Sequence, residues 1–353
     1  MSADFALSCP RPLLRHLTVQ MAHGGGGRAM RTLIEETFIS AFANESLATR
    51  HDSAVLKEEE GRLAFTTDSF VVRPRFFPGG DIGELAVYGT VNDLAMAGAT
   101  PRYLSVGMIL EEGLALEELR RIVASMRRAA HRCGVQIVTG DTKVVEHGKG
   151  DGIFINTAGL GVVPGTRSVG PHRVVPGDVV LLSGDVGRHG IAIMSVREGL
   201  EFETLIESDC APLHEQAHAA CEAGDVHCMR DLTRGGLASA LNEIALDGHV
   251  TIEVEEARIP VLPAVSGACE MLGLDPLYVA NEGRMICFVA PKEADRVQSA
   301  MCASGAEAVA IGSVFAPCEP GRGTTLASVR LRGVLGQTRL LDLLSGEQLP
   351  RIC

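Results

Sequence analysis

Short apolar runs with the character of β-strands alternate along this chain with longer runs that have helical periodicity. The first half predicts strands at residues 63–72, 103–110, 135–139 and 153–163, and a helix at 116–133. The second half predicts strands at 179–183, 285–290 and 308–315, and helices at 187–197, 213–223 and 237–246. Because strands and helices alternate in this way, we expect a layered α/β (α+β) protein.

The turn sequence around Pro176 predicts a boundary between two domains. A chain of 353 residues is long enough for two domains of about 100–200 residues each. A proline and a glycine at positions 176 and 177 come directly before the apolar run 179–183. We therefore expect a glycine-rich segment at 1–45, a first domain at 46–175, a second domain at 176–333 and a C-terminal tail at 334–353. With no Trp and 4% aromatic residues, Ala, Val, Leu and Ile must fill the cores.

The balance of charges excludes one class of partner. There are 32 Lys and Arg against 44 Asp and Glu, and the formal net charge of −12 has the wrong sign for a broad nucleic acid-binding face. No apolar run is long enough to span a membrane, and the N-terminal sequence lacks the apolar stretch of a secretory signal. The ten cysteines form no C-x-x-C pair and are expected to be reduced thiols. The sequence thus predicts a cytoplasmic protein.

The last residue, Cys353, ends a segment of different character. Gly333 and Gly336 are predicted hinges, and an extended segment from Gly336 to Cys353 would reach about 60 Å. Five leucines could dock this segment against a folded surface, although it is too short to fold alone: Leu340, Leu341, Leu343, Leu344 and Leu349. Chain ends are usually disordered and without function, which favours a frayed end at Cys353. The alternative is a thiol on a long arm that can reach two different sites.

Polar residues accompany the predicted strands of the first half, where we expect strand ends to meet. Asp68 closes one apolar run, Asp93 follows Asn92 in a helix-like run, and Asp141 and Lys143 close another run. Since Asp141 and Lys143 are two residues apart, both side chains lie on one face of an extended strand. Asp68, Asp93 and Asp141 supply the oxygen ligands that Mg²⁺ prefers, and Lys143 would neutralise phosphate. Each acid alone could equally be a turn or cap residue.

Glycine-rich segments mark two further candidate sites. The run from Gly24 to Gly27, with Gly25 and Gly26 at its centre, could bind phosphate through backbone N–H groups, yet the Walker and dinucleotide patterns are absent. In the second half, an anion site or a plain helix cap is predicted just ahead of Gly235 and Gly236, at Asp231, Thr233 and Arg234. Glu282 precedes an apolar strand, where it is either a general base or a turn residue.

One motif points to different chemistry. His214 and His218 fit the H-E-x-x-H pattern of zinc peptidases, with both imidazoles on one helical face. The third histidine of the metzincin pattern is missing, so a solvated helix face is the simpler interpretation.

Taken in order, these motifs resemble one family. The segments AHGGGGRAM, TTDSFVV, GTVNDLAMAGATPRYLS, TGDTKVV, MRDLTRGGL, NEGRM and the terminal PRIC are similar to those of the carbamoyl dehydratases of hydrogenase maturation. That family lies within the aminoimidazole ribonucleotide synthetase (PurM-like) superfamily, and the resemblance spans Ala22 to Cys353. The earlier motifs would also fit selenophosphate synthetase or thiamine monophosphate kinase, whereas the terminal PRIC is specific to the maturation family.

The resemblance implies a two-domain PurM-like fold and a homodimer in which the N-terminal sheets pair. It also implies ATP and Mg²⁺ as cofactors. The implied ATP-binding residues are Gly25, Gly26, Asp68, Asn92, Asp93, Asp141, Asp231, Thr233 and Arg234, and the implied metal ligands among them are Asp68, Asp93 and Asp141.

The resemblance further implies a reaction on the chain itself. The thiol of Cys353 would receive a carbamoyl group from the carbamoyltransferase HypF, and ATP would drive its dehydration to a thiocyanate. The cyano group would then pass to iron held by the HypC–HypD complex, for the [NiFe] hydrogenase. Lys143 and Glu282 match residues near the modified cysteine, with Glu282 as base and Lys143 stabilising oxyanion charge. The alternatives are a kinase or synthetase for a free small molecule, and a non-catalytic thiol scaffold.

Overall fold

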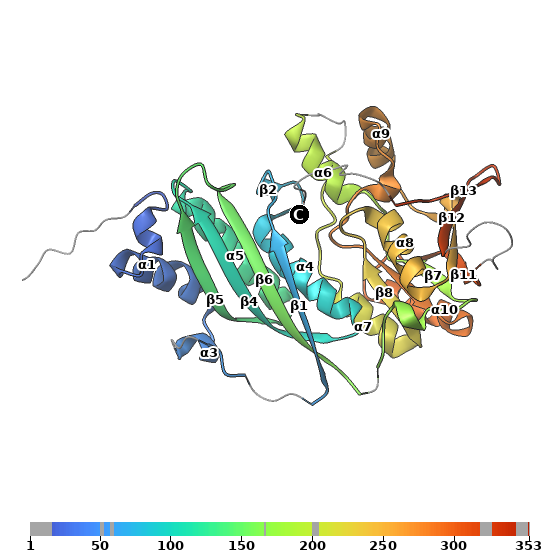
Figure 1. Ribbon diagram of the computed structural model, residues 1–353, viewed down its shortest axis with the longest axis horizontal. Helices are drawn as coiled ribbons and strands as arrows, with labels where there is room; N and C mark the ends of the chain where they lie inside the picture. The colour runs from blue at the N-terminus through green and yellow to red at the C-terminus, as the bar shows by residue number, and fades with distance from the viewer. Residues whose placement is uncertain are drawn as a thin grey trace, which may run out of the picture.

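Two β-sheets with their helices lie side by side along the long axis of the molecule (Figure 1). The structure is a computed structural model, and it describes residues 16–49, 53–56, 60–165, 167–199, 205–317, 327–343 and 352. Within these residues no helix is long and apolar enough to cross a membrane.

The N-terminal sheet has four strands in the order β1-β6-β4-β5. Their bounds are β1 (Arg62–Phe70), β4 (Thr100–Glu111), β5 (Gln136–Val145) and β6 (Ile153–Val163). Only β4 and β5 run parallel, joined by the crossover helix α5 (Leu116–Arg132). A small hairpin of β2 (Phe76–Phe77) and β3 (Gly80–Asp81) leads into α4 (Ile82–Met96). β1 and β5 are therefore the two edges of this sheet.

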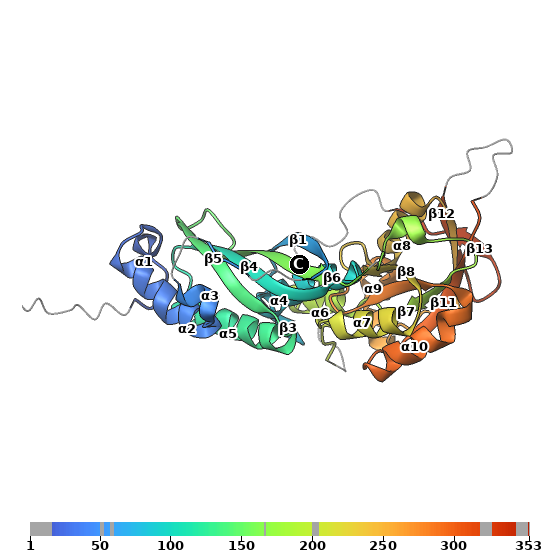
Figure 2. The same ribbon diagram turned by 90° about the horizontal axis from the view of Figure 1, so that it is seen from below.

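All helices of the N-terminal part cover one face of the sheet, as Figure 2 shows. They are α4, α5 and the short segments η1 (Met21–Gly24), α1 (Arg28–Leu33), η2 (Ile34–Ile39), α2 (Ser40–Phe42) and α3 (Glu45–Ala48). In α5 the stripe predicted from helical periodicity is buried, including Leu119, Ile122 and Met126. On the opposite face Leu63, Phe65 and Ile109 are exposed, so within the described residues that sheet face has no cover.

Helix α4 is buried on almost every side because it lies between the two parts of the molecule. Its residues are mostly small or apolar, and they contact β1 and β6 on one side and α7 and β8 on the other. Gly89 permits close packing, since a Cβ there would lie 2.8 Å from the ring of Phe70. The N-cap carboxylate of Asp81 accepts hydrogen bonds from the N–H groups of Gly83 and Glu84 and from the hydroxyl of Ser125.

The C-terminal sheet has seven strands in the order β13-β12-β9-β11-β7-β10-β8. The strands are β7 (Val179–Leu182), β8 (Val226–Asp231), β9 (Thr251–Glu255), β10 (Met285–Val289), β11 (Val309–Phe315), β12 (Ser328–Arg332) and β13 (Thr338–Leu340). The helices are α6 (Arg188–Arg197), α7 (His214–Ala223), α8 (Gly236–Gly248), α9 (Pro263–Leu272) and α10 (Ala294–Ala303), with short turns η3 (Pro171–Arg173), η4 (Glu256–Arg258), η5 (Pro276–Tyr278) and η6 (Pro291–Glu293).

Both faces of this second sheet are covered, which explains why its central strands are apolar throughout. In β10, Met285, Cys287 and Val289 pack with α7 and α10, whereas Ile286 and Phe288 pack with α8 on the other face. The α/β (α+β) class predicted from the alternation of elements is confirmed, with mainly antiparallel pairing.

One strand is longer than the apolar run that predicted it. β5 continues to Val145 instead of ending at residue 139, whereas β1 ends at Phe70, close to the predicted range of 63–72. Asp68, Asp141 and Lys143 therefore lie within strands rather than at strand ends. The polar residues continue the ladder because their backbone groups still pair with a neighbouring strand, Asp68 opposite Thr157 and Asp141 opposite Gly107.

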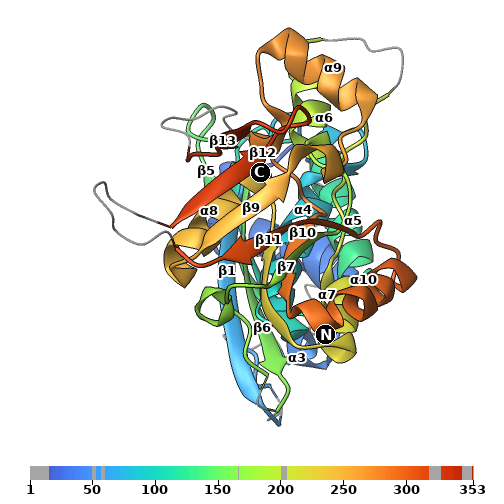
Figure 3. The ribbon, with the colours of Figure 1, turned by 90° about the vertical axis from the view of Figure 1, so that its right-hand side faces the viewer.

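The start of the predicted tail also differs from expectation. β13 pairs with β12 at the sheet edge (Figure 3), and Gly333 and Gly336 form the turn between them. The positive φ of 85° at Gly336 suits a tight turn, so the two glycines are hairpin residues. Leu341 is 1% exposed, and its carbonyl accepts a hydrogen bond from Asn242. The predicted tail is therefore held by the C-terminal sheet at least as far as Leu341.

Candidate active site

Four carboxylates from both parts of the molecule influence one another electrostatically. We call Asp68 of β1, Asp93 of α4, Asp231 of β8 and Glu282, just before β10, the acidic cluster. Burial raises the pKa of Glu282 well above its usual value, and the charges of Asp231, Asp209, Asp68 and Asp93 raise it further. Burial, followed by the charge on Asp93, raises the pKa of Asp231 to about 7. Several carboxyl groups therefore lie close together at this junction of the two domains. Burial disfavours the charged form of each, as do neighbouring acids for Asp93, Asp231 and Glu282.

Asp68 and Asp93 are held together by the contact between β1 and α4. The Asp93 carboxylate accepts a hydrogen bond of 2.8 Å from the hydroxyl of Thr66, two residues from Asp68 on the same face of β1. One helical turn before Asp93, a Cβ at Gly89 would lie 3.6 Å from Asp68 Oδ2. Burial raises the pKa of both carboxyl groups. Asp68 and Asp93 therefore lie on the facing sides of β1 and α4.

Glu282 is a buried carboxylate in a tightly held turn. It is 3% exposed, and its Oε1 has no hydrogen-bond partner among the described residues. The backbone N–H groups of Glu282 and Gly283 donate to the two carboxylate oxygens of Asp209, at 3.3 and 3.0 Å. Asn281 fixes the other side of the turn by accepting a hydrogen bond from the N–H of Gly187. The side chain of Glu282 is therefore positioned by its backbone.

The segment 205–213 connects the turn of Glu282 to the N-terminal part of the molecule, a role that its sequence did not predict. Asp209 holds the turn of Glu282, and Ser208 N–H donates to the carbonyl of Pro78 in the N-terminal part. Asn92 of α4 donates to the carbonyl of Ala211 and accepts from the N–H of Leu213. Asn92 is 2% exposed, so here its amide joins the domains. No periodicity or glycine pattern marks this segment, and its partners are distant in sequence.

The loop before α8 faces the acidic cluster. β8 ends at Asp231, opposite Met285 of β10, and positive φ angles are found at Gly235, the N-cap of α8, and at Gly236, its first residue. A Cβ at Gly236 would lie 2.6 Å from the carbonyl oxygen of Val279, so only glycine fits there. Burial raises the pKa of Asp68, and this rise is partly offset by the N–H of Ser69 and the charge of Arg234. Arg234 is therefore near enough to compensate part of the acidic charge.

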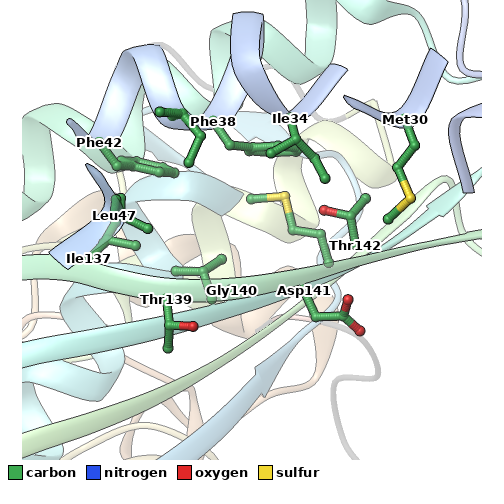
Figure 4. A pocket seen from close by; sticks show the side chains of 13 residues that line it. Met30, Ile34, Phe38, Phe42, Leu47, Ile137, Thr139, Gly140, Asp141 and Thr142 are labelled. Carbon is green, nitrogen blue, oxygen red and sulfur yellow. The ribbon is translucent and has the colours of Figure 1, made fainter. Parts of the chain in front are cut away.

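Asp141 and Lys143 lie elsewhere in the same protomer. Both are exposed on β5 and alternate with the buried Thr142 and Val144. Figure 4 shows Thr142 on the helix side of β5, with Asp141 on the other side. β5 and β1 are opposite edges of the sheet, about 14 Å apart at three strand spacings. One protomer does not bring Asp141 and Lys143 to Asp68.

A small apolar pocket separates β5 from the N-terminal helices (Figure 4). Its volume is about 120 Å³. It is lined by Met30, Ile34, Phe38, Ile39, Phe42, Leu47, Val106, Met108, Ile137, Thr139, Gly140, Asp141 and Thr142. The glycine run lies at the same strand, since a Cβ at Gly24 would be 2.9 Å from Val144 Cβ. Gly25 and Gly26 are thus placed beside β5.

The zinc pattern on α7 has no third ligand in the described part of the chain. His214 and His218 lie on this helix as predicted, and burial lowers the pKa of His214. Among the described residues no group of three or more His, Cys, Asp or Glu side chains is arranged to hold a metal ion. This structure gives the zinc peptidase interpretation no support.

The end of the chain returns to the domain junction. Ile352 is 4% exposed and packs in the core of the N-terminal part. Its carbonyl oxygen accepts a hydrogen bond of 3.0 Å from Nε2 of His189. Cys353 and residues 344–351 lie outside the described residues. The residue before the predicted acceptor thiol is therefore held inside the protein.

Two family models match this arrangement. The N-terminal domain of AIR synthase related proteins matches residues 50–163, and the C-terminal domain of the same proteins matches residues 175–321. The fold is that of a two-domain AIR synthase related protein.

Relatives with known names define the family more closely. The carbamoyl dehydratase HypE of Azotobacter vinelandii is 52% identical over 343 residues, covering 96% of this chain and 98% of that protein. A crystal structure of the hydrogenase maturation protein HypE in complex with ATP matches with a TM-score of 0.90 and 47% identity, covering 95% and 100%. A HypE–HypF complex matches with a TM-score of 0.76 and 44% identity, covering 88% and 99%. The chain belongs to the HypE family of carbamoyl dehydratases, which act in hydrogenase maturation.

Proposed function

We propose that the acidic cluster is the place where ATP drives dehydration of a carboxamide on the chain's own Cys353. The observation that carries this proposal is the position of Ile352. Its carbonyl is bonded to His189, and His189 contacts the segment that holds the turn of Glu282. Because Cys353 follows Ile352 directly in the sequence, the position of Ile352 supports a reaction of the thiol near the acidic cluster. The similar HypE structure with ATP supports the nucleotide.

The chemistry explains which residue types are needed. The oxygen of a thiocarboxamide is a poor leaving group until the γ-phosphoryl group of ATP is transferred to it, which is a matter of positioning and charge neutralisation. Loss of phosphate then forms the C≡N bond, and two N–H protons must leave. Glu282 is a suitable base, because its raised pKa makes the carboxylate a stronger proton acceptor. The products are the thiocyanate, ADP and phosphate.

Two of the three carboxylates that the sequence assigned to Mg²⁺, Asp68 and Asp93, lie together in one chain, and their chemistry suits this ion. Asp68 and Asp93 each use one oxygen in a hydrogen bond within the described part of the chain, and their other oxygens are hard ligands of the kind Mg²⁺ prefers. A bound Mg²⁺ would neutralise phosphate charge. Asp231, Thr233 and Arg234 would then face the anion at the start of α8.

Asp141 and Lys143 require a second copy of the chain in this proposal. They lie on the uncovered face of the N-terminal sheet, which also exposes Leu63 and Phe65. A homodimer that pairs the N-terminal sheets would cover this face and place β5 of one copy against its partner. We propose that Asp141, Lys143, Gly25 and Gly26 act across this interface, with Lys143 stabilising oxyanion charge.

The partners follow from the reaction. A HypF-type carbamoyltransferase would load the thiol, in line with the HypE–HypF complex among the similar structures. A HypC–HypD complex holding iron would receive the cyano group. Both steps need a reduced thiol, which favours the cytoplasm.

Intact-mass spectrometry tests the proposal. Purified chain carbamoylated at Cys353 should lose the mass of one water molecule on addition of MgATP, and Cys353→Ala should show neither modification nor loss. An unchanged mass would contradict dehydration and would favour the interpretation of the chain as a non-catalytic thiol scaffold. A kinase for a free small molecule would keep its ATP turnover in Cys353→Ala.

A further inference from the structure

His189 joins the end of the chain to the interior of the C-terminal part. The residue lies in the first turn of α6 and is fully buried. Its Nε2 is 3.0 Å from the carbonyl oxygen of Ile352, and its Nδ1 is 2.8 Å from the hydroxyl of Ser208. The ring of Phe77 packs edge-on against the imidazole, with centroids 5.4 Å apart. Both ring nitrogens therefore have hydrogen-bond partners, and the ring also contacts Phe77.

The direction of these hydrogen bonds follows from their partners. A carbonyl oxygen can only accept, so Nε2 carries the proton, and in the neutral ring Nδ1 must accept from the hydroxyl of Ser208. Burial lowers the pKa of His189, which favours this neutral form. The hydroxyl of Ser208 in turn accepts from the N–H of Cys210, at 3.0 Å. One tautomer of His189 is thus fixed by its surroundings.

The same segment positions the proposed base. Asp209, between Ser208 and Cys210, accepts the N–H groups of Glu282 and Gly283, and the N–H of Ala211 donates to the carbonyl of Glu282. Residues 208–211 therefore hold the turn of Glu282 on one side and the ring of His189 on the other. One short segment therefore links the anchor of Ile352, through His189, to the turn of Glu282.

We propose that His189 is a positioning residue, which anchors the carbonyl of Ile352 and so sets the place of the reacting thiol relative to Glu282. Cys353 is joined directly to Ile352, so an anchor at this carbonyl leaves the thiol only the freedom of one residue. The proposal rests on the proposed function in one respect, namely that Cys353 carries the reacting group. His189 itself does not touch that group in this scheme.

Thiol labelling of the full-length protein tests the anchor without nucleotide or carbamoyl donor. The rate of maleimide addition to Cys353 is measured by peptide mass spectrometry, with the exposed Cys302 as an internal reference and the buried Cys228 as a reporter of unfolding. Removing the donor by His189→Leu should raise the rate at Cys353 about five- to tenfold, as expected for loss of one buried hydrogen bond. The rates at Cys302 and Cys228 should not change.

Three further variants separate anchoring from general stability. His189→Gln retains an N–H donor and should label close to the wild-type rate. Ser208→Ala removes the partner of Nδ1 and should give an intermediate rate. His218→Leu makes the same change at an exposed histidine of α7 and should label as wild type. If His189→Leu also exposes Cys228, Ser208→Ala carries the test.

The outcomes are distinct. Equal labelling of Cys353 in wild type and His189→Leu would overturn the proposal, as would an equal increase in His189→Gln and His189→Leu. For the carbamoylated protein, His189→Leu should lower the yield of dehydrated product while leaving the KM for ATP unchanged, and His189→Gln should restore the yield. If the maleimide rates change as expected but carbamoylated wild-type protein shows no dehydration, the proposed function is contradicted. The anchoring of Ile352 by His189 would still stand.

Discussion

Glu282 illustrates how a single residue combines a stability cost with a task. Its Oε1 is buried without a hydrogen-bond partner in the described part of the chain, and four other acids raise its pKa further. A buried, unpaired carboxylate destabilises a fold, so its presence in a rigid turn suits a group that must accept protons.

We expect Glu282→Gln to lower the rate of dehydration about 10²–10⁴-fold, the usual contribution of a general base. The free energy of unfolding should rise or stay the same, because a buried carboxyl group that is costly to ionise is replaced by a neutral amide. Single-turnover mass spectrometry and urea unfolding measure the two effects, with Glu270→Gln on the exposed side of α9 as the control. Full dehydration activity in Glu282→Gln would contradict the role of Glu282 as the general base.

Asp231 makes stability depend on pH. Its pKa is raised to about 7, chiefly by burial and by Asp93, so ionisation is disfavoured in the folded state. The stability that protonated Asp231 contributes to the fold is fully present below its unfolded-state pKa of about 3.9. It is lost as pH rises through the folded-state pKa of about 7. Asp231→Asn should therefore increase the free energy of unfolding by about 1–3 kcal/mol more at pH 8 than at pH 5. Urea unfolding at both pH values measures this.

A control of opposite sign is available at Asp225. Hydrogen bonding from Arg173 lowers the pKa of Asp225, so its contribution is present above the unfolded pKa and lost as pH falls. Asp225→Asn should not reproduce the gain at pH 8. A gain in both variants would point to a general charge effect.

The residues that sequence reasoning missed are those whose role depends on distant partners. Asp68, Asp93, Asp231 and Glu282 lie in recognisable motifs and were predicted as site residues. Asp209 and His189 lie in no such motif, because their partners at Glu282 and Ile352 are 73 and 163 positions away. No local pattern encodes a hydrogen bond of that kind.

At the scale of single elements, α4 depends on its N-cap. Asp81 is 7% exposed and accepts three hydrogen bonds, two from the first turn of the helix and one from Ser125 of α5. Asp81→Ala should lower the free energy of unfolding by about 2 kcal/mol, through loss of the cap and of the link to α5. Asp81→Asn retains an acceptor and should lose less than half of that. Equal losses in urea unfolding would show that the charge matters rather than the cap.

Strand ends were the least predictable part of the elements. The apolar run of β5 stops at residue 139, yet pairing with β4 continues to Val145. Hydrophobicity reports which side chains are buried, whereas a strand ends where its neighbour no longer pairs with it. Asp141 and Lys143 still share the face expected from alternation, because that depends only on backbone geometry.

At the scale of the whole molecule, the predicted metal ligands are divided between two regions. The two-domain fold follows from motif order, but the order β1-β6-β4-β5 is set by pairing across the whole first domain and was not readable from the sequence. That order separates Asp68 from Asp141 within a protomer.

Mixed dimers test whether two copies share a site. Asp68→Asn and Asp141→Asn should each be inactive alone, and random mixing should restore about a quarter of wild-type activity, since half the dimers are mixed and each has one intact site. Dehydration measured after unfolding and refolding the two variants together checks this. Absence of recovery would place all ligands in one chain.

The burial of Leu341 against Val329 and Asn242 has a consequence for how partners compete for the terminal sulfur. The chain is fixed at that point, Asp342 and Leu343 are exposed, and Cys353 lies ten positions beyond Leu343. A chain of that length cannot carry the sulfur of Cys353 more than about 34 Å from Leu343. A tether of this length gives the sulfur an effective concentration in about the millimolar range at its own docking site. A partner that loads or unloads Cys353 must therefore bring its reacting centre within about 34 Å of Leu343. It must also bind the body of the protein first, because a freely diffusing partner does not reach the effective concentration of the docking site.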